Sequence, residues 1–197
     1  MLNAVLFDLD NTLVDRDRAF RDCVHARFRD PAVRSELLRL DQGGRGDRQA
    51  LFEFWEHHAG EGINQTILGR LLAERLQPDL GLLQTLRALS NEVKLGIITN
   101  GSGETQRQKF KAAGLAEVIS ADYLWISAEV GTPKPDPAIF LLASQTLGEA
   151  PENCLFVGDH EQDDRAGARA AGMRTRLVKT VLTGDGLNRL ISQERAR

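Results

Sequence analysis

Two aspartates near the start of the chain, Asp8 and Asp10, follow an apolar run and stand two residues apart. If that run is a strand, both carboxylates leave its end on the same side, because side chains two residues apart lie on one face of a strand. One carboxylate can then attack phosphorus while its neighbour transfers a proton, and the acyl phosphate formed is labile enough to hydrolyse. A pair of strand-end acids that caps a turn is the alternative when this segment is considered alone.

A second polar segment follows the apolar residues 96–98. Thr99, Asn100 and Gly101 form a small-residue turn before a helical pattern. The hydroxyl and the exposed backbone N–H groups of such a turn suit phosphate oxygens. Alone the segment is weak evidence, because Thr99 or Ser102 can serve merely as a helix cap.

The third segment places Lys134 between Pro133 and Pro135. The two prolines stiffen the backbone on both sides of the lysine. A rigidly held ammonium can offset negative charge on a nucleophile and on a phosphoryl group. A solvated lysine in a proline-rich turn is the alternative, and it fits the stiffening poorly.

The fourth segment is an apolar run that ends in a cluster of acids. Asp159 directly follows Gly158, and Asp163 and Asp164 come shortly after it. Carboxylate oxygens are the hard ligands that Mg²⁺ takes, usually with several waters retained. Asp159 is the favoured ligand, and an acidic loop without a metal is the alternative.

The elements that must position these residues are strands that alternate with helices. Apolar runs predict strands at 4–9, 93–99, 123–127, 154–158 and 175–178, and helical patterns lie at 104–113, 137–147 and 163–171. This alternation indicates a parallel sheet with right-handed crossovers. Open sheets of this type bind ligands at the carboxyl ends of their strands, where the four polar segments lie.

The gap between the first two expected strands, roughly eighty residues, is far longer than one crossover helix requires. Within it Asp30 precedes a proline at the first helical position, and Asp47 and Asn64 are placed to cap further helices. We therefore expect a helical cap over residues 15–78, inserted into an α/β catalytic core formed by residues 1–14 and 79–197.

Together the four segments resemble the motifs of the haloacid dehalogenase-like hydrolases, in the same order along the chain. The family's Asp-x-Asp-x-Thr stands here as residues 8–12, its second motif as Thr99, its third as Lys134, and its Gly-Asp-x-x-x-x-Asp as Gly158-Asp159 with Asp164. The family's type 1 helical caps lie at the position of the insertion. The resemblance implies a Rossmann-like parallel sheet flanked by helices, with a small helical cap domain after the first strand.

The resemblance also implies a role for each of these residues. Asp8 would attack phosphorus, and Asp10 would protonate the leaving alcohol and later activate water. Thr99 and the Asn100 backbone would hold phosphoryl oxygens, while Lys134 would compensate charge in the transition state.

A magnesium ion is implied as well, held by the Asp8 carboxylate, the Asp10 backbone carbonyl and Asp159. Asp164 would be a further ligand through water, or a partner that orients the ligands. Asp163 occupies a position that is often asparagine in the family, and we rank it below Asp164.

The intact Asp10 favours phosphate ester hydrolysis, because the dehalogenating members of the family attack carbon and do not keep this acid. A phosphoryl-transferring mutase stays open as an alternative, as does a catalytically silent binding module. A phosphoacceptor signalling domain is disfavoured, because domains of that kind are shorter than this chain and have no cap. Phosphonate hydrolysis would require a Schiff-base lysine, and residues 15–76 contain no lysine.

The expected substrate is a small phosphorylated metabolite, and a sugar phosphate, a nucleoside monophosphate and phosphoglycolate are all compatible. Arg16 and Arg18 are the cap arginines closest in sequence to Asp8, so they are candidates for a second anionic group. A solvated, salt-bridged surface is the default for most cap arginines. The glycine-rich residues 42–46 are a candidate mobile segment, which would permit broad specificity.

The bulk composition limits the other partners. The chain has 197 residues, of which 42% are apolar and 27% charged, as in an ordinary globular protein. Its net charge of -3 gives no general reason to bind nucleic acid or an anionic membrane surface. No apolar run approaches the roughly 20 residues of a membrane span, and the first residues read as a strand rather than a signal peptide. The two cysteines suit a reducing compartment, so we expect a cytoplasmic enzyme, with its oligomeric state left open.

Overall fold

The computed structural model describes residues 1–196, in which five strands form one parallel sheet. The strands are β1 (Ala4–Phe7), β2 (Lys94–Thr99), β3 (Leu124–Ile126), β4 (Cys154–Gly158) and β5 (Arg174–Leu177). Their order across the sheet is β3-β2-β1-β4-β5. The first strand is therefore the central one, and its neighbours on either side are β2 and β4.

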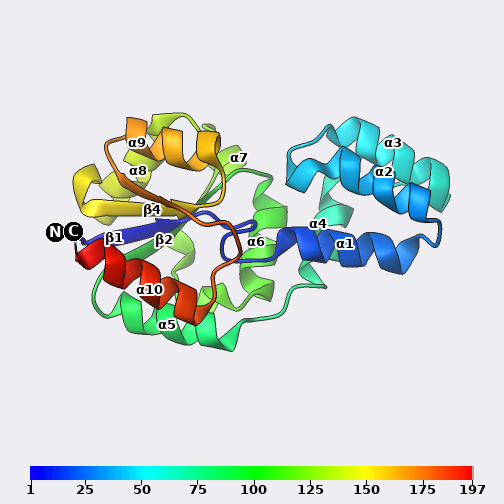
Figure 1. Cartoon of the computed structure of the whole chain (residues 1–197). Helices are drawn as coiled ribbons and strands as arrows, with labels where there is room; N and C mark the ends of the chain where they lie inside the picture. The colour runs from blue at the N-terminus through cyan, green and yellow to red at the C-terminus, as the bar shows by residue number, and fades with distance from the viewer. Residues whose placement is uncertain (197) are drawn as a thin grey trace.

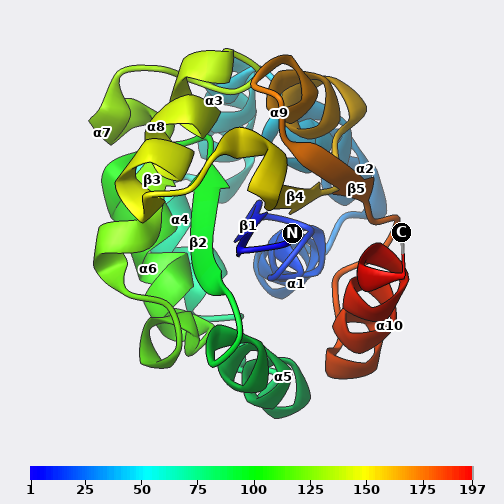
Figure 2. The same cartoon turned by 90° about the vertical axis from the view of Figure 1, so that its left-hand side faces the viewer.

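Helices cover both faces of the sheet (Figure 2). One face is covered by α5 (Leu80–Ser90), α6 (Gly103–Ala112) and α10 (Gly184–Arg195), the other by α7 (Ser127–Val130), α8 (Pro137–Leu147) and α9 (Gly167–Ala170). Side chains of β1 alternate between the two layers: Val5 and Phe7 pack with the first group, and Leu6 packs with the second. This burial on both faces explains why β1, β4 and most of β2 read as continuous apolar runs.

A group of helices follows β1 and precedes β2 in the sequence. In space these helices lie at the end of the molecule opposite the two chain termini (Figure 1). These helices are α1 (Arg16–Arg27), α2 (Pro31–Asp41), α3 (Arg48–Ala59) and α4 (Gln65–Ala73). The side chains of Asp30, Asp47 and Asn64 accept hydrogen bonds from the first turns of α2, α3 and α4, as the sequence predicts. The fold class is thus confirmed as an α/β core with an inserted helical cap. The boundaries 15–78 remain our proposal, and residue 197 of the expected core lies outside the described residues.

The cap contacts the core closely where α4 packs against α6. Gly69 permits this approach, because a Cβ built on it would lie 2.5 Å from Oγ1 of Thr105. The Thr105 hydroxyl in turn donates to the carbonyl of Gln65 at 3.4 Å. One side of α6 is therefore fixed against the cap, while other residues of the same helix face the strand ends.

Apart from shifts of one residue at element ends, the observed elements differ from the expected ones mainly in three places. The strand predicted at 4–9 ends at Phe7, because the chain turns beyond it, with Asn11 at a φ of 60°. The helix predicted at 163–171 is a π-helical turn, η5 (Glu161–Ala166), followed by α9. The helices α5 and α10, which pack against each other, were not among the predicted elements. Within residues 1–196, the helices fall short of the length and apolar character that a membrane crossing would require.

Candidate active site

The carboxyl ends of β1, β2 and β4 lie side by side, and each of them delivers one of the predicted polar segments. A cavity of about 320 Å³ opens there. Its lining combines core residues with a loop of the cap: Asp8, Asp10, Thr99, Asn100, Lys134 and Asp163 from the core, and Gly43, Gly44 and Arg45 from the cap. The predicted site residues are thus brought together from distant parts of the chain, and Asp159 and Asp164 adjoin them.

Lys134 lies at the centre of the buried charges. Its Nζ is 2.6 Å from Oδ1 of Asp8 and 2.6 Å from Oδ1 of Asp164. Burial alone would lower the pKa of this lysine, but the two carboxylates outweigh it and raise the pKa, so the side chain is a firmly held ammonium. Burial raises the pKa of Asp8 to about 7, against the lowering effect of Lys134.

Asn100 fixes the backbone of Lys134 from the end of β2. The Lys134 N–H donates to Oδ1 of Asn100 at 2.9 Å, and Nδ2 of Asn100 donates back to the Lys134 carbonyl at 2.9 Å. Sequence analysis assigned only the backbone of Asn100 to the site. Its amide side chain therefore has a structural contact that was not predicted, and this contact joins the second motif to the third.

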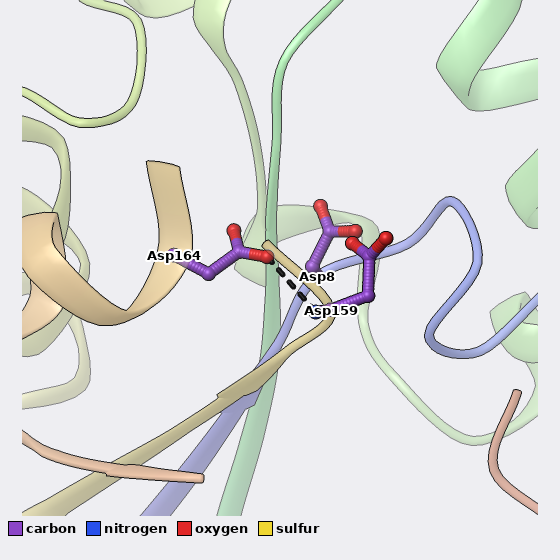
Figure 3. A group of neighbouring side chains, drawn as sticks. All are labelled: Asp8, Asp159 and Asp164. Atoms are coloured by element: carbon purple, nitrogen blue, oxygen red, sulfur yellow. Dashed lines mark hydrogen bonds between the residues drawn. The ribbon is translucent and has the colours of Figure 1, made fainter. Parts of the chain in front are cut away.

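Three carboxylates form a cluster next to Lys134 (Figure 3). Asp8, Asp159 and Asp164 each offer an oxygen, and these oxygens lie within 4.8 Å of one another. Asp164 is buried, and its Oδ2 accepts from the backbone N–H groups of Asp159 at 3.0 Å and His160 at 2.9 Å. Asp164 thus orients the loop that carries Asp159.

This cluster fits a divalent cation. Its oxygens are hard donors of the kind that Mg²⁺ prefers. Three carboxylates and the Lys134 ammonium leave a formal charge of −2, which Mg²⁺ would neutralise. Burial also raises the pKa of Asp159 and the neighbouring Asp164 adds to this rise, whereas Arg45 and Lys134 oppose it. Asp163 is not a member of this cluster, and its carboxylate contacts Nδ1 of His160 at 3.1 Å.

Asp10 has two partners that sequence analysis missed. The Nζ of Lys109, on α6, is 2.5 Å from Oδ1 of Asp10 and also contacts Oδ2. Nε2 of Gln106, one turn earlier on α6, donates to Oδ2 at 3.1 Å. Burial would raise the pKa of Asp10, but Lys109 reverses the effect and the pKa is lowered. Their spacing of three residues puts Gln106 and Lys109 on one face of α6, but the sequence does not show that this face meets Asp10 rather than solvent.

The Thr99 hydroxyl accepts a hydrogen bond from the same glutamine, Gln106. Nε2 of Gln106 donates to Oγ1 of Thr99 at 2.6 Å. The alternative role of Thr99 as a helix cap does not apply, because Ser102 caps α6 by accepting from Thr105 N–H. The buried hydroxyl of Thr99 is therefore part of the cavity wall.

The cap reaches the site through Arg45. Its Nη2 lies 3.5 Å from Oδ1 of Asp159, and its Nε lies 3.6 Å from Oδ2 of Asp163. Arg16, which sequence analysis favoured for an anionic group, is buried and bound to Asp41. Arg18 lines a different cavity, next to the junction of cap and core. Of these three arginines, it is Arg45 that lines the cavity at the strand ends.

The loop that carries Arg45 is fixed at its base. Oδ1 of Asp41 accepts from Nη2 of Arg16 at 2.6 Å and from Nη1 of Arg48 at 3.1 Å. Oδ2 of Asp41 accepts from the Gly44 N–H at 3.2 Å. Gly46 is packed so tightly that a Cβ on it would lie 1.8 Å from the Leu40 carbonyl oxygen. The glycine-rich residues 42–46, the candidate mobile segment, are therefore tied at their base to a buried carboxylate.

Comparisons with known proteins agree with this arrangement. A family model described as haloacid dehalogenase-like hydrolase matches residues 2–172. A phosphoserine phosphatase of Thermus thermophilus is 48% identical over 80 residues, which are 41% of this chain and only 31% of that protein. A glyceraldehyde 3-phosphate phosphatase of Methanopyrus kandleri is 29% identical over 201 residues, which cover 91% of this chain and 84% of that protein.

Among solved structures, the HAD-hydrolase YfnB from Bacillus subtilis, bound to magnesium, is similar to this chain with a TM-score of 0.73. The match covers 97% of this chain and 99% of YfnB, at 20% sequence identity. At that identity the likeness bears on the fold alone, and it agrees with the sheet and the inserted helices described above.

Proposed function

The chain belongs to the haloacid dehalogenase-like hydrolase family, and on that premise we propose that it hydrolyses small phosphate monoesters through a phosphorylated Asp8. The observation that carries this proposal is that Asp8, Asp10, Thr99 and Lys134 line one cavity. The two similar relatives described above are both phosphatases, of different substrates. They support phosphate ester hydrolysis as the reaction class. Because their substrates differ, they do not identify the substrate of this chain, which we expect the cap to select.

The first chemical step uses both aspartates. A carboxylate oxygen of Asp8 attacks phosphorus, the ester P–O bond breaks, and Asp10, which enters this step protonated, gives its proton to the leaving oxygen. The products of this step are the free alcohol and an acyl phosphate on Asp8.

The second step returns the enzyme to its starting state. Asp10, now a carboxylate, takes a proton from water, and the water oxygen attacks phosphorus. The P–O bond to Asp8 breaks, which releases inorganic phosphate and restores the Asp8 carboxylate. Asp10 thus serves as acid in one step and as base in the next.

The transferring phosphoryl group needs donors and positive charge. The Thr99 hydroxyl and the Asn100 backbone N–H are the proposed hydrogen-bond donors to its oxygens. Lys134 is positioned to compensate charge on both the nucleophile and the phosphoryl group, because its ammonium already contacts Asp8.

Mg²⁺ is the proposed cofactor. The Asp8 carboxylate, the Asp10 backbone carbonyl and the Asp159 carboxylate would hold it, with Asp164 orienting the Asp159 loop or binding through water. When bound, the ion would neutralise negative charge on the phosphoryl oxygens and on Asp8.

The leaving group must lie between the two aspartates and the cap loop. Arg45 lines this space. Within residues 1–196 its guanidinium makes two long contacts, to Asp159 and Asp163, which leaves several of its donors available to a ligand. We therefore propose that Arg45 contacts the alcohol part of the ester. A loop held at its base favours selection among small leaving groups over broad specificity.

The proposal is tested by measuring phosphate release from a panel of phosphorylated metabolites and a nitrophenyl phosphate, with Mg²⁺ or with a chelator. We expect release that requires Mg²⁺ and that Asp8→Asn abolishes. Conversion of a sugar phosphate into its isomer without release of inorganic phosphate would replace the phosphatase by a mutase. No turnover of any ester would favour a binding module.

A further inference from the structure

Lys109 and Gln106 lie at the active site without belonging to any of the four motifs. We propose that these two residues of α6 are positioning residues for Asp10: they hold its carboxylate where it can exchange protons with the leaving oxygen and with water. The inference rests on the proposed function and adds two residues to its machinery.

The contact between Lys109 and Asp10 is the first observation. The Lys109 side chain is 3% exposed, and its ammonium is bound to both oxygens of a carboxylate 99 residues away in sequence. A buried ammonium requires a partner, since isolation from water is costly. Among the ion pairs found in residues 1–196, Asp10 is the one carboxylate that pairs with Lys109.

The second observation is that the side-chain amide of Gln106 contacts three groups of the site. Its Nε2 lies 3.1 Å from Oδ2 of Asp10, 2.6 Å from Oγ1 of Thr99 and 2.9 Å from the Asn100 carbonyl oxygen. The two N–H groups of this amide are shared among the three acceptors, so one side chain links the proposed acid and base to the proposed phosphoryl-binding turn. Because this amide donates to the Thr99 oxygen, the Thr99 hydroxyl keeps its own proton for donation. In this structure that proton points to the Asn100 carbonyl, at a long 3.4 Å, and it can turn to a phosphoryl oxygen instead.

Asp10 needs such support because of where it lies. Its carboxylate is 25% exposed, in a loop between β1 and the cap, and Asn11 beside it has a positive φ. In the described part of the chain, its side-chain hydrogen bonds come from Lys109 and Gln106 alone. Proton transfer requires a donor within hydrogen-bond distance, and a displacement of about 1 Å can cost roughly a hundredfold in rate.

Comparing esters with different leaving groups separates a role in positioning Asp10 from a merely structural role. An alkoxide needs a proton to depart, whereas a nitrophenolate departs without one. If Asp10 is misplaced, an alkyl phosphate therefore reacts slowly in the first step. A nitrophenyl phosphate still phosphorylates Asp8 quickly, but water then attacks slowly, so that nitrophenolate appears in a burst.

The experiment compares the wild type with Lys109→Met, Lys109→Arg and Asp10→Asn, in rapid-mixing assays with an alkyl and a nitrophenyl phosphate. Lys111→Met is the matched control, because Lys111 is an exposed lysine on the same helix. We expect Lys109→Met to lower kcat for the alkyl ester roughly a hundredfold, with KM changed less than about twofold. It should also give a burst close to one nitrophenolate per active site, as Asp10→Asn does. Lys109→Arg should recover part of the rate, and Lys111→Met should behave as wild type.

Equal losses on both esters without a burst would overturn the inference, as would an unchanged kcat. If Lys109→Met does not fold, Gln106→Met gives the second test, since it removes the amide without leaving a buried charge. For Gln106→Met, the rate of alkyl phosphate hydrolysis should fall more than the rate of the nitrophenolate burst. Equal falls in the two rates would contradict a role of Gln106 in positioning Asp10. A failure of the proposed function can be told apart from a failure of this inference. If the proposed function is wrong, Asp10→Asn itself gives no burst and slows both esters equally.

Discussion

The ammonium of Lys134 lies 2.6 Å from the carboxylate of Asp8, although 126 residues separate them in sequence. The same ammonium contacts Asp164, so one cation links the first, third and fourth motifs. We predict that Lys134→Met lowers kcat by roughly 10²–10³, because charge developing on the phosphoryl group loses its counter-ion. Phosphate release at saturating substrate measures this loss.

The same substitution should also destabilise the protein. Removing Lys134 leaves the buried carboxylates of Asp8 and Asp164 without the cation that pairs them, which typically costs about 3–5 kcal/mol. Urea unfolding in the presence of a chelator measures the change, with Lys111→Met as the control. An unchanged midpoint for Lys134→Met would mean that the two acids are protonated and need no cation.

Arg45 offers a prediction about substrate selection. We expect Arg45→Ala to raise KM roughly tenfold, the cost of one charge-assisted hydrogen bond, with little change in kcat. Arg18→Ala should leave both constants unchanged, since Arg18 is exposed and lies by Asp15. Steady-state kinetics on the preferred ester distinguishes the two variants. A fall in kcat alone for Arg45→Ala would move this arginine from the leaving group to the transferring phosphoryl group.

Asp41 should contribute to stability as the buried partner of Arg16. Asp41→Ala leaves the buried guanidinium of Arg16 with only its longer contact to Asp17, at 3.3 Å, and should cost about 3–5 kcal/mol. The double variant Arg16→Met, Asp41→Leu removes both charges and should be more stable than the single one. Urea unfolding of the three proteins measures the difference, and a double variant less stable than Asp41→Ala would contradict this account.

Cys154 provides a prediction about pH. Burial raises the pKa of its thiol from 9.0 to about 11. The folded state therefore keeps this proton at pH values where the unfolded chain has lost it, and stability should fall as pH rises from about 9 to about 11. Urea unfolding of wild type and Cys154→Ala across this range tests the effect, which the variant should show less strongly. An identical pH dependence in both proteins would exclude Cys154 as its source.

Much of the site could be predicted because parallel sheets place polar residues at strand ends. The strand Cys154–Gly158 has the predicted bounds, and the acids that follow it cluster with Asp8 as expected. The caps Asp30, Asp47 and Asn64 were predictable from local chemistry alone. The leucines of α5, at positions 82, 83, 86 and 89, have helical spacing, so this helix was also within reach of the sequence.

The contacts that were missed depend on how distant elements pack. Gln106 and Lys109 look like the solvated face of a polar helix, and they are buried only because α6 begins beside Asp10. Arg45 reaches the site only because the cap lies over the strand ends. No local pattern in the sequence encodes either of these placements.

The most direct test of the account is to locate the phosphoryl group on the enzyme. Asp10→Asn would be mixed with a nitrophenyl phosphate and Mg²⁺, quenched in acid and digested for mass spectrometry. We predict that the peptide containing Asp8 gains the mass of one phosphoryl group, and that the double variant Asp8→Asn, Asp10→Asn gains none. A phosphoryl group on another residue, or none at all while the wild type turns over the same ester, would contradict the central role of Asp8.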